Sequence, residues 1–300
     1  MTVTNSVPMP FIAESSSSDF FSRSLRCCCA ISSDMLLLRD LPSWAAFQPF
    51  SASRAYVLKG KVPNLWSMAT VVVALGGSLL RPEVEGRQTW LQGMVEVIVS
   101  RVESGSKVAL VVGGGAPARE GIELAKPFIE DVSHLDRIGI AATRLNATIV
   151  REALSEGGVA VSAKIPESIG EAVLELEKWD VVVMGGTEPG HTTDAVAIRL
   201  AIQSEAEKCV IATNVSRVYA EDPRHNPEAK SFDELTLSEL QEIVGPPEHA
   251  EAGSSQVVDP VGVGEALEHG LNLDVLDGRD TEEINKSLQG ENFEGTRVRG

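Results

Sequence analysis

The chain reads Gly185-Gly-Thr-Glu-Pro-Gly-His-Thr-Thr-Asp194 between an apolar run, Val181-Val-Val-Met184, and a helical pattern, Ala195-Val-Ala-Ile-Arg-Leu200. This order indicates a strand, then a loop large enough to surround a phosphate group, and then a helix. Glycines let the backbone approach a ligand closely, the threonines offer hydroxyl donors, and the helix directs unpaired N–H groups and its positive dipole end at the loop. We therefore expect an anion in this loop. Asp194 adds a carboxylate beside that anion, which requires a metal ion or a basic side chain between them.

Two further strand-to-glycine junctions indicate the same kind of site. Thr70-Val-Val-Val-Ala-Leu75 runs into Gly76-Gly-Ser78, and Lys107-Val-Ala-Leu-Val-Val112 runs into Gly113-Gly-Gly115, with a helical pattern at 118–125 after it. Short apolar strands that alternate with amphipathic helices predict an α/β fold whose parallel sheet is covered on both faces. The glycine turns then converge at the carboxyl ends of the strands, where ligands of open α/β folds bind.

The glycine clusters lack both common nucleotide signatures, the Gly-x-x-x-x-Gly-Lys-Ser/Thr P-loop and the Gly-x-Gly-x-x-Gly dinucleotide spacing. The chain instead resembles the amino-acid-kinase superfamily, and within it the archaeal-type uridylate (UMP) kinases, over about residues 69–300. The matching segments are Leu75-Gly-Gly-Ser-Leu79, Val111-Val-Gly-Gly-Gly115 with Ala118-Arg119, Asp136-Arg-Ile-Gly139, Ala142-Thr-Arg-Leu-Asn-Ala147, Gly185 to Ala197, Ala212-Thr-Asn-Val215, Val218-Tyr219 with Asp222-Pro223, and Ala252-Gly-Ser-Ser255 with Asp259-Pro260.

The resemblance implies a fold, a reaction and partners. The fold is a three-layer αβα sandwich with a mainly parallel central sheet. Residues 68–300 form the kinase domain, with the acceptor-binding part at about 68–200 and the ATP-binding part at about 201–300. The reaction transfers the γ-phosphoryl group of ATP to UMP and gives UDP and ADP, in pyrimidine nucleotide (CTP) synthesis. Mg²⁺ is expected to arrive with the nucleotide, and family members usually form homohexamers built from dimers.

The resemblance also implies site residues. The expected catalytic residues are Arg119 and Asp194, and no side chain is assigned as a metal ligand. The residues expected at UMP are Gly114, Asp136, Thr187, Glu188, Pro189, Gly190, His191, Thr192 and Thr193. The residues expected at ATP are Gly77, Ser78, Gly115, Arg119, Thr213, Tyr219 and Asp222.

Several of these residues allow a plainer interpretation. Arg119 could be a surface cation, and Asp136 and Asp194 could each only cap a following helix. His191 could contribute its backbone and one hydrogen bond, and Tyr219 could pack in the core instead of stacking on adenine.

The chain also departs from the family pattern on the ATP side. The family commonly has Asp-Gly where this chain has Ser216-Arg217, so a turn that tolerates positive φ is replaced. The family often has a lysine after Asp259-Pro260, where this chain reads Gly262-Val-Gly264-Glu265. Arg119 is then the best remaining cation for the transferred phosphoryl group, with Mg²⁺ supplying the rest. Arg144 and Asn146 are candidates for a structural or intersubunit role.

Two other functions remain open. A superfamily kinase could act on a different phosphate or carboxylate acceptor, such as isopentenyl phosphate, acetylglutamate or carbamate, because glycine loops do not determine the acceptor. Alternatively, the chain could be a non-catalytic nucleotide-binding regulator that kept the fold and lost turnover, because a fold alone never proves activity.

Composition and charge argue against several partners. Residues 1–67 hold six Lys/Arg and four Asp/Glu, so residues 68–300 carry −19 within a formal net charge of −17 for the whole chain. An acidic surface of this density repels nucleic acid and anionic lipid. No apolar run reaches the roughly 18 residues of a membrane span. The four cysteines have neither metal-ligand nor disulfide spacing, which favours a reduced, cytoplasmic protein.

The first 67 residues differ from the rest of the chain. They are serine-rich, hold five of the eight phenylalanines and show no sustained helix or strand period. Met68 stands directly before the first apolar strand. Three explanations of residues 1–67 are considered: the start codon is misassigned and the protein begins at Met68, the segment is a targeting leader, or it is a real added segment.

Overall fold

The computed structural model of the chain describes residues 69–80, 86–223, 225–226, 228–248 and 257–300. The expectations for residues 1–67 and for Ala252-Gly-Ser-Ser255 lie outside the described residues. Among those described, no helix combines the length and the apolar character that a membrane crossing requires.

A seven-stranded sheet in the order β3-β2-β1-β4-β8-β9-β7 forms the centre of the described part. Neighbouring strands are parallel except for β8 and β9. Its members are β1 (Thr70–Leu75), β2 (Lys107–Val112), β3 (Val181–Met184), β4 (Lys208–Thr213), β7 (Glu234–Thr236), β8 (Leu273–Asp277) and β9 (Gly295–Arg299). The three strands predicted from apolar runs are confirmed with their predicted bounds. A separate antiparallel pair consists of β5 (Val218–Tyr219) and β6 (Ser231–Phe232).

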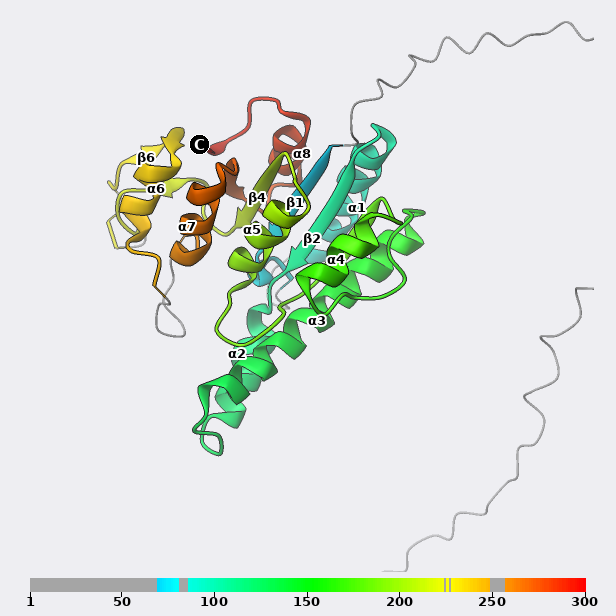
Figure 1. Ribbon diagram of the computed structural model, residues 1–300, viewed down its shortest axis with the longest axis horizontal. Coiled ribbons are helices and arrows are strands. Elements are labelled where there is room, and N and C mark those ends of the chain that lie inside the picture. Colours follow the sequence, from blue (N-terminus) through cyan, green and yellow to red (C-terminus); the bar gives the residue numbers. More distant parts are fainter. Residues whose placement is uncertain (1–68, 81–85, 224, 227, 249–256) are drawn as a thin grey trace, which may run out of the picture. The chain divides into compact units, whose positions relative to one another are not determined.

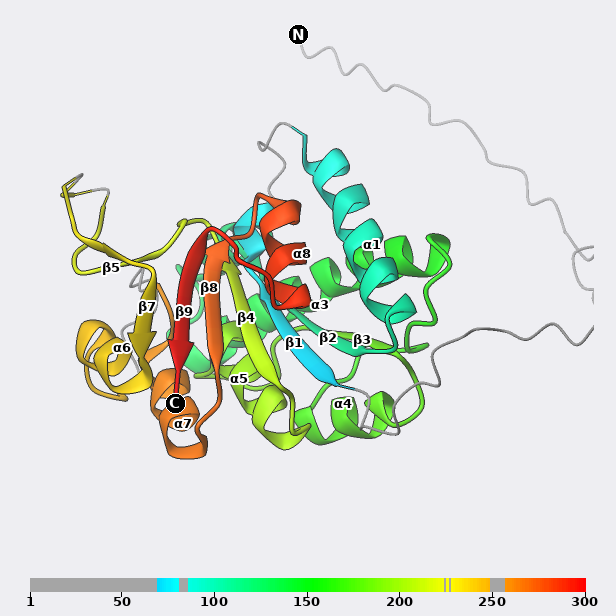
Figure 2. The ribbon, with the colours of Figure 1, turned by 90° about the horizontal axis from the view of Figure 1, so that it is seen from above.

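Helices cover both faces of this sheet, as Figure 2 shows. One face packs against α1 (Arg87–Glu103), α3 (Val132–Glu156) and α8 (Thr281–Gln289). The other packs against α4 (Ile169–Leu176), α5 (Thr193–Gln203), α6 (Leu237–Val244) and α7 (Pro260–His269). Alternate residues of one strand point to opposite faces, so Val71 and Val73 enter one core while Val72 and Ala74 enter the other. The predicted three-layer αβα sandwich is confirmed.

Two further helical segments follow the glycine turns. A short 3-10 helix, η1 (Gly77–Leu80), comes after β1, and α2 (Gly115–Ala125) comes after β2. Figure 1 shows α2 and α3 projecting together beyond the sheet. The helices α2 and α5 begin at Gly115 and Thr193, earlier than the predicted 118 and 195. The apolar period misses these first turns because small and polar residues occupy them.

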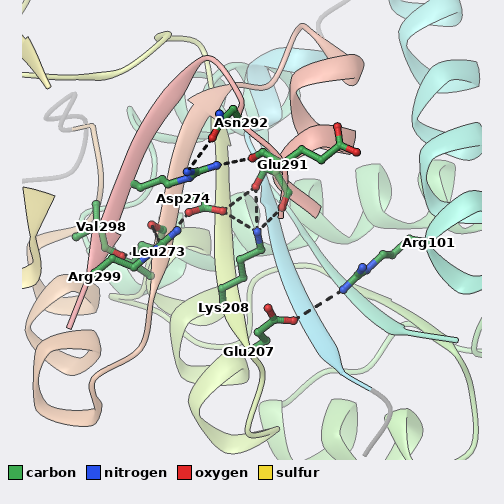
Figure 3. A network of polar contacts seen from close by, with 11 residues as sticks. Arg101, Glu207, Lys208, Leu273, Asp274, Glu291, Asn292, Val298 and Arg299 are labelled. Carbon is green, nitrogen blue, oxygen red and sulfur yellow. Dashed lines mark hydrogen bonds and ion pairs between the residues drawn. The ribbon is translucent and has the colours of Figure 1, made fainter. Parts of the chain in front are cut away.

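A buried polar network ties the strands together at the end of the sheet opposite the glycine turns (Figure 3). Lys208 Nζ lies 2.8 Å from Asp274 Oδ2, and Ser287 Oγ donates to the same oxygen at 2.9 Å. Arg299 Nη1 binds the other oxygen, Oδ1, at 3.0 Å. A buried carboxylate is stable only when it is paired and hydrogen-bonded, and here two cations and a hydroxyl pair it. The network therefore joins β4, β8, β9 and α8 and has a structural role.

Candidate active site

The glycine turns after β1 and β2 pack backbone against backbone. A Cβ atom on Gly77 would lie 2.1 Å from the Gly115 nitrogen, and one on Gly115 would lie 2.1 Å from the Gly77 carbonyl oxygen. Gly115 also has a φ of +60°, which L side chains rarely adopt. Only glycine fits at either position. The close approach leaves the start of α2, with its unpaired N–H groups, at the carboxyl ends of the strands, which we call the rim.

Side chains of the helix α3 hydrogen-bond to the backbone of the loops at this rim. The buried amide of Asn146 donates from Nδ2 to the carbonyl oxygens of Gly113 and Gly114 at 2.8 and 3.0 Å. The hydroxyl of Thr143 accepts from the Gly186 N–H at 2.7 Å. The same helix therefore fixes the turn after β2 and the start of the loop after β3. Of the two roles left open for Asn146, these contacts show the structural one.

The loop of residues 185–192 follows β3, and we call it the acceptor loop. It contains six of the nine residues predicted at UMP, and Thr193 begins the helix that follows it. The Gly190 N–H donates to Asp136 Oδ2 at 2.9 Å, which brings a seventh, from α3, to the loop. His191 Nδ1 lies 3.5 Å from Glu188 Oε1 within the loop. These residues are thus brought together, and their contact with UMP stays a prediction.

The two caps proposed as plainer interpretations are wrong. Asp136 lies inside α3, whose N-cap is Asp131, with its side chain accepting from the Ser133 N–H. Asp194 lies inside α5, whose N-cap is Thr192, with its hydroxyl accepting from the Ala195 N–H at 3.2 Å. Each helix starts earlier than its apolar pattern, so the capping residue lies earlier as well.

Asp194 has a second carboxylate as its electrostatic neighbour. Burial, and next the negative charge of Asp259, raise the pKa of Asp194 to about 7. Asp259 caps α7, and its Oδ1 accepts from the Val261 and Gly262 N–H groups at 2.9 and 3.0 Å. Its Oδ2 accepts from the Thr192 hydroxyl at 2.8 Å. The N-terminal ends of α5 and α7 therefore meet at the rim with two carboxylates between them.

Asp259 was not among the predicted site residues. Its sequence signal is an aspartate directly before a proline that opens a helix, which predicts an N-cap. That pattern gives no indication of Thr192 as its partner.

A pocket of about 160 Å³ lies beyond the end of β4. Its lining includes the three residues predicted along the ATP nucleoside, Thr213, Tyr219 and Asp222. The other lining residues are Asn214, Val215, Ala220, Glu221, Pro223, Ile243, Val244 and Val257. The Tyr219 hydroxyl lies 2.9 Å from Ser216 Oγ at the pocket. Ser216 and Arg217 stand where the family commonly has Asp-Gly, and Arg217 forms ion pairs with Asp233 and Glu294.

Arg119 lies on the first turns of α2 and is exposed. No described residue forms an ion pair or hydrogen bond with its guanidinium group, so it is available to a ligand. Gly77 and Ser78 belong to η1, against which α2 packs. The predicted phosphate-side residues thus surround the two glycine turns.

Comparisons with known proteins identify the family of the chain. A profile of the Amino acid kinase family matches residues 69–271. The uridylate kinase of Methanococcus maripaludis is 41% identical over 228 residues, which cover 76% of this chain and 98% of that protein. The uridylate kinase of Natronomonas pharaonis is 38% identical over 221 residues, which cover 74% and 95%.

Solved structures show the same relationship. The crystal structure of uridylate kinase from Archaeoglobus fulgidus is 36% identical and superimposes with a TM-score of 0.67, covering 76% of this chain and 99% of that one. The UMP kinase of Bacillus anthracis, at 24% identity and a TM-score of 0.63, covers 77% and 95% and shares the fold.

Proposed function

Because the chain belongs to the amino acid kinase family, we propose that it transfers the γ-phosphoryl group of ATP to UMP and releases UDP and ADP. The observation that carries the proposal is the strand order β3-β2-β1-β4. The acceptor loop follows β3, the two glycine turns follow β2 and β1, and the nucleoside pocket follows β4. The two nucleotides can therefore lie on opposite sides of the glycine turns, with their phosphates meeting over them.

Phosphoryl transfer requires mainly positioning and neutralisation of charge on the transferring group. The contact between Gly77 and Gly115 lets both phosphate chains approach the backbone closely. The start of α2 adds unpaired N–H groups and a positive dipole end. Arg119, exposed on the same helix, would bind phosphate oxygens with its planar guanidinium group.

Mg²⁺ fits the donor set at the rim. Magnesium is usually held by one or two carboxylates together with substrate phosphates, and Asp194 and Asp259 would supply the carboxylates. Burial, and next the charge of Asp259, raise the pKa of Asp194 and so disfavour its ionised form, which a nearby cation would stabilise. Among the described residues, no group of three or more His, Cys, Asp or Glu side chains could hold a metal by itself. An ion carried by ATP suits this arrangement, and it would neutralise charge on the phosphates.

An acceptor panel tests the proposal directly. ADP release would be measured by a coupled assay with UMP, CMP, isopentenyl phosphate, acetylglutamate and carbamate, each at saturating MgATP. We expect turnover with UMP to exceed turnover with every other acceptor by at least roughly a hundredfold, a ratio within reach of a site that hydrogen-bonds its substrate. Preference for another acceptor would make the chain a different kinase of the family. Binding of UMP without ADP formation would make it a regulator.

We further propose that the chain assembles as a homohexamer. The projecting α2 and α3 and the connection between them carry large exposed apolar side chains, which suit an interface with another copy of the chain. They are Leu124, Phe128, Val132, Leu145 and Ile149, with exposed fractions between 44% and 86%. Light scattering should give six times the chain mass. Leu145→Asp with Ile149→Asp should reduce that mass, while Leu267→Asp, at an exposed leucine on α7, should not.

A further inference from the structure

The helices α5 and α7 run side by side in the same direction, with three contacts in register. At the two N-caps, the Thr192 hydroxyl donates to Asp259 at 2.8 Å. One turn further, a Cβ atom on Gly262 would lie 3.2 Å from the Ala195 Cα and 2.9 Å from Ile198 Cδ1. One more turn along, Arg199 meets Glu265. From one contact to the next, the contacting residues lie three or four positions further along each helix. The three contacts therefore fix how far α5 can shift along α7.

The third contact is the strongest polar one. The Arg199 Nε donates to both oxygens of Glu265 at 2.9 and 2.8 Å, and Nη2 donates to Oε1 at 2.7 Å. Both side chains are largely buried, with 21% and 27% exposed. A two-point guanidinium–carboxylate contact fixes orientation as well as distance. At Gly262 the Ile198 side chain packs closely against α7, and the ion pair adds a directional contact to this apolar one.

The placement of this pair has a consequence for the rim. Two parallel helices with adjacent N-terminal ends bring two like dipole ends together, and each end here also holds a carboxylate. The negative charge of Asp259 adds to burial in raising the pKa of Asp194, so the interaction between the two carboxylates depends on how the two helix ends lie. At the rim, the Thr192 hydroxyl links the two ends through its hydrogen bond to Asp259. The ion pair two turns below can hold the helices without occupying space that a ligand needs.

We infer that Arg199 and Glu265 are positioning residues, whose ion pair fixes α5 against α7 and thereby sets the geometry of the two carboxylates at the rim. In the transfer reaction this role rests on the function proposed above. Neither side chain touches the reacting atoms. A displacement of about 1 Å at a reacting centre can reduce turnover by roughly a hundredfold, so the pair affects the rate through the helix ends.

Replacing both residues by methionine separates positioning from stability. A largely buried ion pair exchanged for apolar side chains of similar size keeps or raises stability, while the directional contact is lost. Arg199→Met with Glu265→Met should therefore keep the melting temperature. Turnover should fall roughly ten- to a hundredfold, with the Michaelis constant for UMP changed less than about threefold. The exchanged pair, Arg199→Glu with Glu265→Arg, should recover part of the turnover lost in either single variant.

Hydrogen exchange provides a measurement that does not depend on catalysis. In the double methionine variant, amide exchange should rise in peptides covering 192–200 and 257–266 and stay unchanged in the strands. A matched control, Lys286→Met with Glu283→Met, removes an ion pair on α8 and should change neither turnover nor exchange at the rim. Unchanged exchange in the two peptides, or unchanged turnover, would overturn the inference. Absence of UMP turnover in the unmodified protein would instead refute the proposed function, and the exchange result would still decide the role of the pair.

Discussion

The carboxylate of Asp136 accepts a hydrogen bond of 2.9 Å from the Gly190 N–H, although 54 positions separate the two residues. Gly190 has a φ of +84°, so the turn at the tip of the acceptor loop depends on glycine. The long helix α3 thus holds the tip of the loop through Asp136, as it holds the start of the loop through Thr143. Oδ2 makes this bond, and no described residue donates to Oδ1, which leaves that oxygen for a substrate hydroxyl.

Asp136→Ala is expected to raise the Michaelis constant for UMP by roughly ten- to a hundredfold, because hydrogen bonds to a charged group contribute about 1.5–3 kcal/mol. Asp136→Asn should lie between this variant and the unmodified protein, since an amide oxygen can still accept from Gly190. Initial rates at saturating ATP measure both.

Asp131→Ala is the matched control on the same helix. It removes the N-cap of α3 and should lower stability by about 1 kcal/mol without changing the Michaelis constant for UMP. An unchanged Michaelis constant in Asp136→Ala would show that the carboxylate only holds the loop.

A chain that starts at Met68 is expected to fold and to retain full UMP-dependent turnover. Among the described residues, both cores of the sheet are built from side chains between Val71 and Val298, and domains usually tolerate removal of a terminal segment that lies outside the core. Thermal unfolding and turnover of the full-length and shortened chains measure this. Insoluble protein after the shortening would mean that residues 1–67 contribute to folding.

The sheet and its rim could be predicted because their signals are local. An apolar run followed by glycines marks a buried parallel strand and its turn, and the strands at 70–75, 107–112 and 181–184 have these bounds in the structure. The sequence alone was therefore enough to place the site residues of these turns at the carboxyl ends of the strands. The family resemblance added the nucleoside pocket, where Thr213, Tyr219 and Asp222 do lie together.

The rest of the site depends on contacts between distant segments. The Thr192 hydroxyl meets Asp259 across 67 positions, and Arg199 meets Glu265 across 66. Neither pair has a periodic or compositional signal, because each forms only when α5 and α7 pack. The incorrect cap at Asp136 has a local cause, since Asp131 is an equally good capping residue five positions earlier.

Asp194→Asn should leave the protein folded and reduce turnover by roughly a hundredfold or more. The cap of α5 is Thr192, so the substitution removes charge without removing the cap. Circular dichroism checks the fold, and turnover at saturating UMP and ATP checks the effect. Asp280→Asn, which exchanges one capping residue for another at α8, should retain turnover. Near-normal turnover in Asp194→Asn would remove this residue from the catalytic set.

The same variant should change how stability depends on pH. The pKa of Asp194 is raised to about 7 by burial and by Asp259, whereas an unfolded aspartate titrates near about 4. The folded state therefore holds a proton that the unfolded chain releases, and this stabilisation is lost as pH rises through about 7. Without nucleotide or metal, Asp194→Asn should gain melting temperature relative to the unmodified protein between pH 5 and pH 8.

Calorimetry at several pH values measures that difference. Adding Mg²⁺ with ATP at pH 8 should stabilise the unmodified protein more than the variant, because only the carboxylate gains from a nearby cation. A difference in melting temperature that stays constant with pH would mean that Asp194 is solvated and titrates normally.

Arg119→Lys distinguishes a role in the transition state from a role in binding ATP. Lysine keeps the charge and loses the planar two-point contact with phosphate oxygens. If Arg119 acts mainly on the transferring group, turnover should fall by roughly ten- to a thousandfold with a smaller change in the Michaelis constant for ATP. Arg297→Lys, a conservative change on β9, should leave both constants unchanged. An anchor of bound ATP would behave differently, since its replacement raises the Michaelis constant and leaves saturated turnover nearly intact. That result would remove Arg119 from the catalytic residues, and the transferring phosphoryl group would then depend on the start of α2 and on the metal for its neutralisation.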